Sequence, residues 1–203
     1  MLGGTLALGA GLHRRHGWRI AVMAGVAGML PDWDGLTLVF GGAAYDQSHR
    51  IWGHNLLVAA LLGGLAGCVE YRANLTDRLR RVAARLSPSL AVNSLHSSAP
   101  PNASSVVTLV VWFVTGSVAS LSHLAVDLVY SGHPHMQSWG LQLYWPFSRR
   151  EWAYPIVPWG DVGATLIFVA EMFALYCWPR RAKPIAWLTL VSLLTYVGLR
   201  AVL

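Results

Sequence analysis

The sequence predicts an all-α integral membrane protein, a helical bundle of five to six helices with interfacial loops, in a single membrane-embedded domain over residues 1–203. Three observations predict this class. Of the 203 residues, 55% are hydrophobic and only 12% are charged, which leaves too little polar surface for a water-soluble domain. Several apolar runs reach the roughly 20 residues that a helix needs to cross a bilayer. The basic residues gather in the short stretches between those runs, as is typical of loops beside anionic lipid.

The N-terminal part of the chain contains two short apolar segments and one full span. Residues 2–12 are expected to form a half-span or an interfacial helix, because they are too short to cross a bilayer. Residues 18–30 reach only part of the way before the turn Leu-Pro-Asp-Trp-Asp-Gly, whose proline and glycine favour a break in the helix. Residues 51–69 are long enough and apolar enough to cross.

The C-terminal part contains two further clear spans, at residues 106–130 and 185–203, and a segment of about sufficient length at 161–178. Residues 70–105 are expected to form a surface loop, in which a basic helical stretch is followed by a linker rich in proline, serine and asparagine. The loop at 131–160 is rich in proline and tryptophan, which suits irregular backbone at the level of the lipid headgroups.

The arginine and lysine residues predict how the chain is oriented. If the spans alternate in direction, eleven of the 15 basic residues fall on one side of the membrane, and the positive-inside rule makes that side cytoplasmic. These eleven are Arg14, Arg15, Arg19, Arg72, Arg78, Arg80, Arg81, Arg85, Arg180, Arg181 and Lys183. The sequence therefore predicts a protein of the prokaryotic cytoplasmic (inner) membrane, with the helix ends that carry aspartate and histidine on the extracytoplasmic side.

Two aspartates, Asp32 and Asp34, flank Trp33 in the turn after the second apolar segment. In the ordinary interpretation, one carboxylate caps the following helix and the other is solvated. In the alternative, both are oxygen ligands of a divalent metal, on one ion or bridging two.

His49, Arg50 and His54 follow at the start of the next apolar run. On one ideal helix the two histidines would point about 140° apart, so His49 is expected on a loop or first turn from which it bends back toward His54. Each histidine alone is more often a hydrogen-bonded helix-end residue than a metal ligand. An arginine at a membrane edge is usually a snorkelling side chain or a lipid contact.

His123 and Asp127 form the clearest geometric pattern in the chain. They are four residues apart on a long apolar helix, so they share one face at about 5–6 Å between Cβ atoms. Either the pair serves one site, or it is a hydrogen bond that joins helices within the membrane. Polar groups in apolar surroundings need a partner in both cases.

Taken together, six imidazole and carboxylate side chains are predicted to converge on one membrane interface. Six is about the number that a two-metal site needs if each ion keeps a position open for water or substrate. The predicted cofactor is a divalent metal, as one or two ions, with zinc ahead of manganese or iron. His133 and His135 are weaker candidates, because exposed histidines in loops are common. The six predicted ligands are Asp32, Asp34, His49, His54, His123 and Asp127.

The stretches LPDWDG, HRIWGHNLL and LSHLAVDL, followed by YWP, resemble the YdjM-type family of bacterial and archaeal membrane proteins classed as metal-dependent hydrolases, over roughly residues 17–158. The family pattern is a Leu-Pro-Asp-x-Asp turn, a His-Arg-Gly-x-Thr-His-Ser element and a Ser-His-x-x-x-Asp helix before a Trp-Pro loop. The resemblance implies that the six residues occupy the family's metal-site positions. Gly53 and Asn55 depart from the pattern, and Thr5 stands where the family tends to have a histidine.

The functional hypothesis is a membrane-embedded metal-dependent hydrolase that acts on a lipid-linked substrate, with a phosphoester ahead of an amide or carboxyl ester. A metal-activated water would attack, Arg50 would neutralise charge on the substrate oxygen, and Asp34 would accept the proton of the water. The expected partners are membrane lipid and the lipid-linked substrate, and no nucleic acid.

Two other functions fit the same residues. A metal-ion or proton transporter would use them as an ion path, although the cytoplasmic halves of the spans at 51–69 and 106–130 contain almost no polar side chains beyond threonine and serine. A non-catalytic membrane scaffold would keep a structural metal and recruit lipid or a soluble partner through the basic stretch at 71–85.

Overall fold

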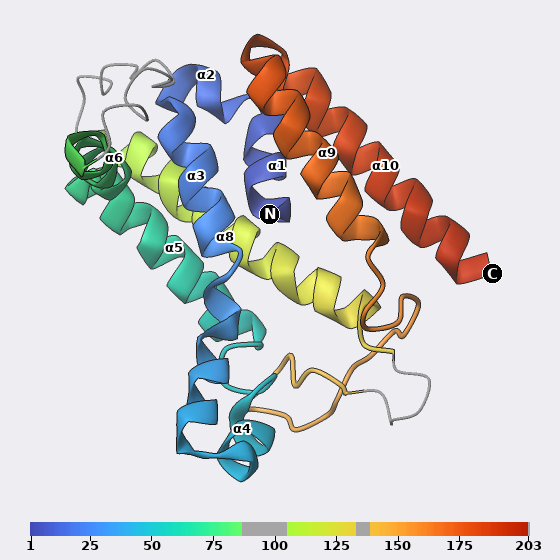
Figure 1. Cartoon of the computed structure of the whole chain (residues 1–203). Coiled ribbons are helices and arrows are strands. Elements are labelled where there is room, and N and C mark those ends of the chain that lie inside the picture. The colour runs from blue at the N-terminus through green and yellow to red at the C-terminus, as the bar shows by residue number, and fades with distance from the viewer. Residues whose placement is uncertain (87–104, 133–138, 203) are drawn as a thin grey trace.

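The computed structural model describes residues 1–86, 105–132 and 139–202. Within them the regular structure is helical, apart from isolated β-bridges between Gly132 and Pro158 and between Leu141 and Trp152. This confirms the predicted all-α membrane bundle (Figure 1). The elements are α1 (Leu2–Gly9), α2 (Leu12–His16), α3 (Trp18–Ala27), the 3₁₀ helix η1 (Leu30–Phe40), α4 (Gly42–Ser48), α5 (Leu56–Ala73), α6 (Leu75–Leu86), α8 (Val106–Val129), α9 (Gly163–Cys177), η2 (Pro179–Arg181) and α10 (Ala182–Val202).

Three segments of the described residues are long and apolar enough to cross a membrane: α5, α8, and η2 with α10. They correspond to the three clear spans expected from the sequence. Helices α3 and α9 are apolar but shorter, as expected for the partial segments. The expected start of the first full span at residue 51 was wrong. Helix α5 begins at Leu56, because the Asn55 side chain accepts a hydrogen bond from the backbone N–H of Val58 at 2.9 Å and caps the helix there.

Helices α5 and α8 cross at glycine residues, where their backbones touch. A methyl group added to Gly63 of α5 would overlap the carbonyl oxygen of Gly116 on α8, and one added to Gly67 would overlap that of Trp112. The Ser117 hydroxyl also donates to the carbonyl of Ala60 across the crossing at 2.8 Å. Small residues let membrane helices approach this closely. The crossing holds the first turn of α5 beside the last turns of α8.

A second core forms around the short helix α1. Buried residues of α1, α3, α8 and α10 pack there, and small side chains such as Ala24, Ala119 and Ala186 make close contacts. In this core Thr5 of α1 donates a buried hydrogen bond to the Glu171 carboxylate of α9 at 2.7 Å. The partial helices α1 and α3 are therefore stabilised by packing inside the bundle, not by spanning the bilayer.

The two ends of the bundle differ in their chemistry. Figure 1 shows α2, α6 and the turn between α9 and α10 at one end, and α4 at the other, below the last turn of α3. The first end carries the arginine clusters of α2, α6 and η2, as the alternating orientation predicts. Which side of the membrane this end faces stays a prediction. Of the predicted loop at 70–105, residues 70–86 are helical and residues 87–104 lie outside the described part of the chain.

The helix crossing leads to a first prediction. Replacing Gly63 with alanine puts a methyl group against the backbone of α8, where no side chain can move to relieve it. We expect Gly63→Ala to lower the free energy of unfolding by about 1–3 kcal/mol, measured by denaturation in detergent. Gly198→Ala on α10 is the matched control, because nothing lies within 4 Å of its added methyl group. Equal stabilities for the two variants would contradict the backbone contact.

Candidate metal centre

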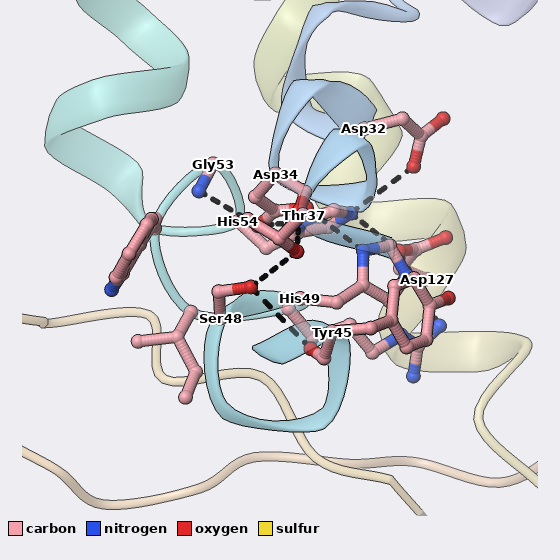
Figure 2. Close-up of polar contacts among 12 residues, drawn as sticks. Asp32, Asp34, Thr37, Tyr45, Ser48, His49, Gly53, His54 and Asp127 are labelled. Atoms are coloured by element: carbon pink, nitrogen blue, oxygen red, sulfur yellow. Dashed lines mark hydrogen bonds and ion pairs between the residues drawn. The ribbon is translucent and has the colours of Figure 1, made fainter. Parts of the chain in front are cut away.

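The structure brings all six predicted ligands and Arg50 together at the end of the bundle opposite the arginine clusters. Figure 2 shows Asp32, Asp34, His49, His54 and Asp127 in this cluster. They come from three stretches of the chain. Asp32 and Asp34 lie on η1, and His49 ends α4. Arg50 and His54 lie in the turn before α5, and the remaining pair lies on α8.

The carboxylate of Asp34 is the centre of the cluster. It is fully buried, at 0% exposure. Its Oδ1 lies 2.8 Å from Nδ1 of His49, and its Oδ2 lies 3.0 Å from Nδ1 of His54. The backbone N–H of Gly53 donates to Oδ2 at 2.8 Å. One buried carboxylate thus receives three donors from the two segments that follow it in the chain.

Local sequence features make this arrangement possible. Pro31 is at the start of η1, where its fixed φ angle suits a helix start. The turn at residues 50–54 passes so close to η1 that a methyl group on Gly53 would overlap the carbonyl oxygen of Pro31. Arg50 adopts a left-handed φ of 65° within the same turn. A hydrogen bond between the hydroxyls of Thr37 and Ser48 joins η1 to α4.

A first set of donor atoms faces a common point. His54 Nε2 lies 3.2 Å from the Asp127 carboxylate and 3.4 Å from that of Asp32. His123 Nε2 lies 3.3 Å from Asp32 and 3.6 Å from Asp127. Both nitrogens are buried, and neither makes a hydrogen bond of good geometry within the described residues. Two imidazole nitrogens and two carboxylate oxygens that converge without bonding to one another suit a divalent metal ion.

A second set of donors lies next to the first. Atoms of Asp34, His49 and His54 lie within 4.8 Å of one another, as do those of Asp32, His54 and His123. His54 belongs to both sets, because its Nδ1 faces Asp34 and its Nε2 faces the other carboxylates. Both sets could hold a metal ion. Whether one or two ions bind stays a prediction.

The pKa values reflect a concentration of negative charge around His54. Burial alone would lower the pKa of His54, but the carboxylates of Asp127, Asp32 and Asp34 raise it to about 10. Burial would raise the pKa of Asp34, and the imidazoles of His49 and His54 with the Gly53 N–H lower it to about 2. Burial would likewise raise the pKa of Asp32, but hydrogen bonds and charge from the imidazoles of His123 and His54 hold it well below its usual range. The carboxylates therefore need a cation among them, either a proton on His54 or a metal ion in its place.

Arg50 lies beside the cluster and is only 6% exposed. One guanidinium nitrogen lies 3.4 Å from the Asp127 carboxylate, and another donates to the Trp139 carbonyl at 2.6 Å. The guanidinium also lies over the rings of Trp139 and Trp159, at 5.8 and 5.4 Å from their centroids. The ordinary interpretation of Arg50 as a snorkelling side chain is therefore wrong, and its predicted catalytic role stays a prediction.

Sequence reasoning missed the residues that hold His49. Its ring stacks on Tyr45 at 4.5 Å between centroids and meets Trp139 edge-on at 5.3 Å. The only signal for Trp139 was the density of tryptophan in the loop at 131–160, which we attributed to the lipid interface. Gly53 was noted as a departure from the family pattern, although its lack of a side chain is what the turn requires.

Other candidates lie elsewhere. Thr5 is hydrogen-bonded to Glu171 in the core of the bundle, so it does not replace a ligand at this cluster. Outside the cluster, the Asp161 carboxylate accepts from the N–H of Gly163, the first residue of α9, and pairs with Arg200. His133 and His135 lie outside the described residues.

Comparison with known protein families supports the membrane assignment of the chain. The chain matches, over residues 1–203, the sequence model of a family described as YdjM inner membrane protein. No curated protein and no solved structure matches the chain.

The buried carboxylate leads to a second prediction, which concerns stability. In Asp34→Asn the amide cannot accept from three donors or balance a charged imidazole, so buried donors lose their partner. We expect the free energy of unfolding, measured in detergent with a chelator present, to fall by about 3 kcal/mol. Asp46→Asn is the control, because Asp46 is exposed on α4. If both variants matched the wild type, Asp34 would not organise the cluster.

Proposed function

The chain belongs to the YdjM inner membrane protein family, and from that premise we propose that it is a metal-dependent hydrolase that acts on a lipid-linked substrate, with a phosphoester as the first candidate bond. One observation supports the proposal above the others. His54 and His123 each aim a buried Nε2 without a hydrogen bond at the same pair of carboxylates. Two imidazole nitrogens and two carboxylate oxygens are ligands that zinc, manganese and iron accept, and water would bind such an ion as a fifth ligand.

In this proposal the ligands of the main ion are Asp32, His54, His123 and Asp127. Asp34 is assigned a positioning role behind them. Because its carboxylate accepts from the Nδ1–H groups of His49 and His54, it fixes the tautomer of both rings and leaves each Nε2 as the free lone pair. A second ion held by Asp34, His49 and His54 would take the place of the protons in these hydrogen bonds, so His49 is the residue that separates a one-ion from a two-ion site.

The proposed chemistry is hydrolysis by an activated water. A bound divalent ion lowers the pKa of its water toward about 7 and polarises the bond under attack. We assign the role of proton acceptor to Asp32 and not, as the sequence suggested, to Asp34. Asp34 is fully buried, with its oxygens already bonded, whereas the Asp32 side chain is 52% exposed and keeps an oxygen open to solvent. Arg50, held beside Asp127, places positive charge next to the substrate oxygens.

The surroundings of the site favour a lipid-linked substrate. Helix η1, which carries both aspartates, exposes a row of apolar side chains at its far end: Leu36, Leu38, Val39 and Phe40 are 59–83% exposed. Exposed apolar side chains on the helix that carries the two aspartates suit the boundary between headgroups and acyl chains. A substrate with its reactive bond at that boundary reaches the cluster without leaving the membrane.

A transporter is less consistent with the packing. One direct path for an ion from the cluster toward the other end of the bundle runs between α5 and α8. The backbones of these helices are in contact at Gly63 and Gly116, and Gly67 abuts Trp112. This crossing leaves no space for an ion between the two helices.

The metal site is tested by measuring the metal content of detergent-purified protein by plasma mass spectrometry. We expect one or two equivalents of zinc, manganese or iron in the wild type, and loss of that metal in the double variant His123→Ala, Asp127→Ala. His16→Ala is the control, because His16 lies on α2 at the opposite end of the bundle. If the wild type contained no metal even after reconstitution, the hydrolase proposal would be wrong.

Catalysis is tested on metal-loaded protein with a panel of phosphoester lipids, by mass spectrometry of the products. We expect turnover of at least one lipid class that stops on chelation and returns with added metal. Asp32→Asn should abolish turnover. Metal-loaded, folded protein that cleaves no member of the panel would count against hydrolysis and favour the structural-metal scaffold.

A further inference from the structure

Helix α6 has one continuous apolar face that the rest of the described chain does not cover. Leu75, Leu79, Val82 and Leu86 follow one another at intervals of four, three and four residues, which places them in one stripe along the helix. They are 42%, 69%, 49% and 82% exposed, in that order. None of the residues of α6 is buried. The helix therefore presents its apolar side outward, a costly arrangement if that side faced water.

The other sides of α6 are basic. Its sequence contains four arginines against one aspartate. Arg80 lies near Asp77, at 4.0 Å, whereas no ion pair is found for Arg78, Arg81 or Arg85 within the described residues. On a helical projection, Arg78, Arg81 and Arg85 all follow the same edge of the apolar stripe. A stripe of leucine and valine edged by unpaired arginines matches a lipid leaflet, whose acyl chains are apolar and whose headgroups are anionic.

Specific contacts fix the direction of α6. Asn74 takes a left-handed conformation, φ 53°, and ends α5. The Glu70 carboxylate then accepts from Arg19 at 3.0 Å and from the backbone N–H of Thr76 at 3.0 Å, and so joins α3 and α5 to the first turn of α6. Arg19 also lies 3.7 Å from Asp77.

These contacts turn α6 across the direction of the spans. In Figure 1, α6 is seen almost along its axis, whereas α5, which precedes it, runs across the view. The helix thus lies transverse to α5 at the end of a membrane span. This is the geometry of a helix that lies in the plane of a membrane surface.

We propose that α6 is an interfacial helix that binds the anionic phospholipid surface of the leaflet at this end of the bundle. Its leucine and valine stripe lies among the upper acyl chains, and Arg78, Arg81 and Arg85 contact lipid phosphates. The contacts made by Glu70 and Arg19 hold it at the depth at which α5 leaves the membrane. The proposal is independent of the metal centre, because α6 lies at the opposite end of the bundle.

The test places an environment-sensitive fluorescent label on single cysteines in the full-length protein, after replacement of Cys68 and Cys177. One label replaces Leu79 in the apolar stripe. The other replaces Ala84, about 140° around the helix from Leu79. The protein is reconstituted in nanodiscs of phosphatidylcholine alone or of phosphatidylcholine mixed with phosphatidylglycerol, and an aqueous quencher is added.

We expect the label at Leu79 to be several-fold less accessible to the aqueous quencher than the label at Ala84, with a further decrease when phosphatidylglycerol is present. High salt should reverse that further decrease, because it screens the arginines. The triple variant Arg78→Gln, Arg81→Gln, Arg85→Gln should lose the dependence on phosphatidylglycerol and keep the apolar protection. Equal accessibility of the two labels in both lipids would overturn the proposal. Protection of Leu79 that is the same with and without phosphatidylglycerol in the wild type would leave the arginines without contacts to anionic lipid, and would also overturn it.

Discussion

The burial of the Asp34 carboxylate is the constraint on which the candidate site depends. A buried carboxylate is tolerated only with several well-placed donors, and Asp34 obtains them from His49, Gly53 and His54. Those donors come from the end of α4 and from the turn before α5, so one charge ties η1 to the two segments that follow it. Asp34 also binds Nδ1 of both imidazoles. The Nε2 of His54 therefore points toward Asp127 on α8.

The other half of the site depends on how two spans pack. His54 precedes α5 directly, and His123 and Asp127 lie near the end of α8. The glycine crossing of α5 and α8 holds these ends together. The contact between the backbones of these two helices thus places the charged groups at the end of the bundle. The loop that contains Trp139 covers Arg50 and His49. The opposite end is organised by a different ion pair, Arg19 with Glu70, which sets the angle between α5 and α6.

Much of the candidate site could be predicted from the sequence, because the spacing of residues along the chain determines which side chains lie on the same face of a helix. His123 and Asp127 share a face by helical periodicity, and the uneven spacing of His49 and His54 placed a turn between them, as the structure has it. The start of α5 was misplaced because hydropathy does not register a side-chain cap such as Asn55. The position of Asp34 behind the histidines, and the packing of Trp139 on Arg50, depend on contacts between distant segments. Periodicity and composition contain no information about those contacts.

The central claim is that imidazole Nε2 atoms and carboxylate oxygens, oriented by Asp34, form one metal centre. X-ray absorption at the metal edge of the metal-loaded protein tests it most directly. The claim predicts nitrogen and oxygen ligands at about 2.0–2.2 Å, with scattering from two imidazole rings and no sulfur. A shell that contains sulfur from Cys68 or Cys177, or only oxygen without imidazole scattering, would contradict it.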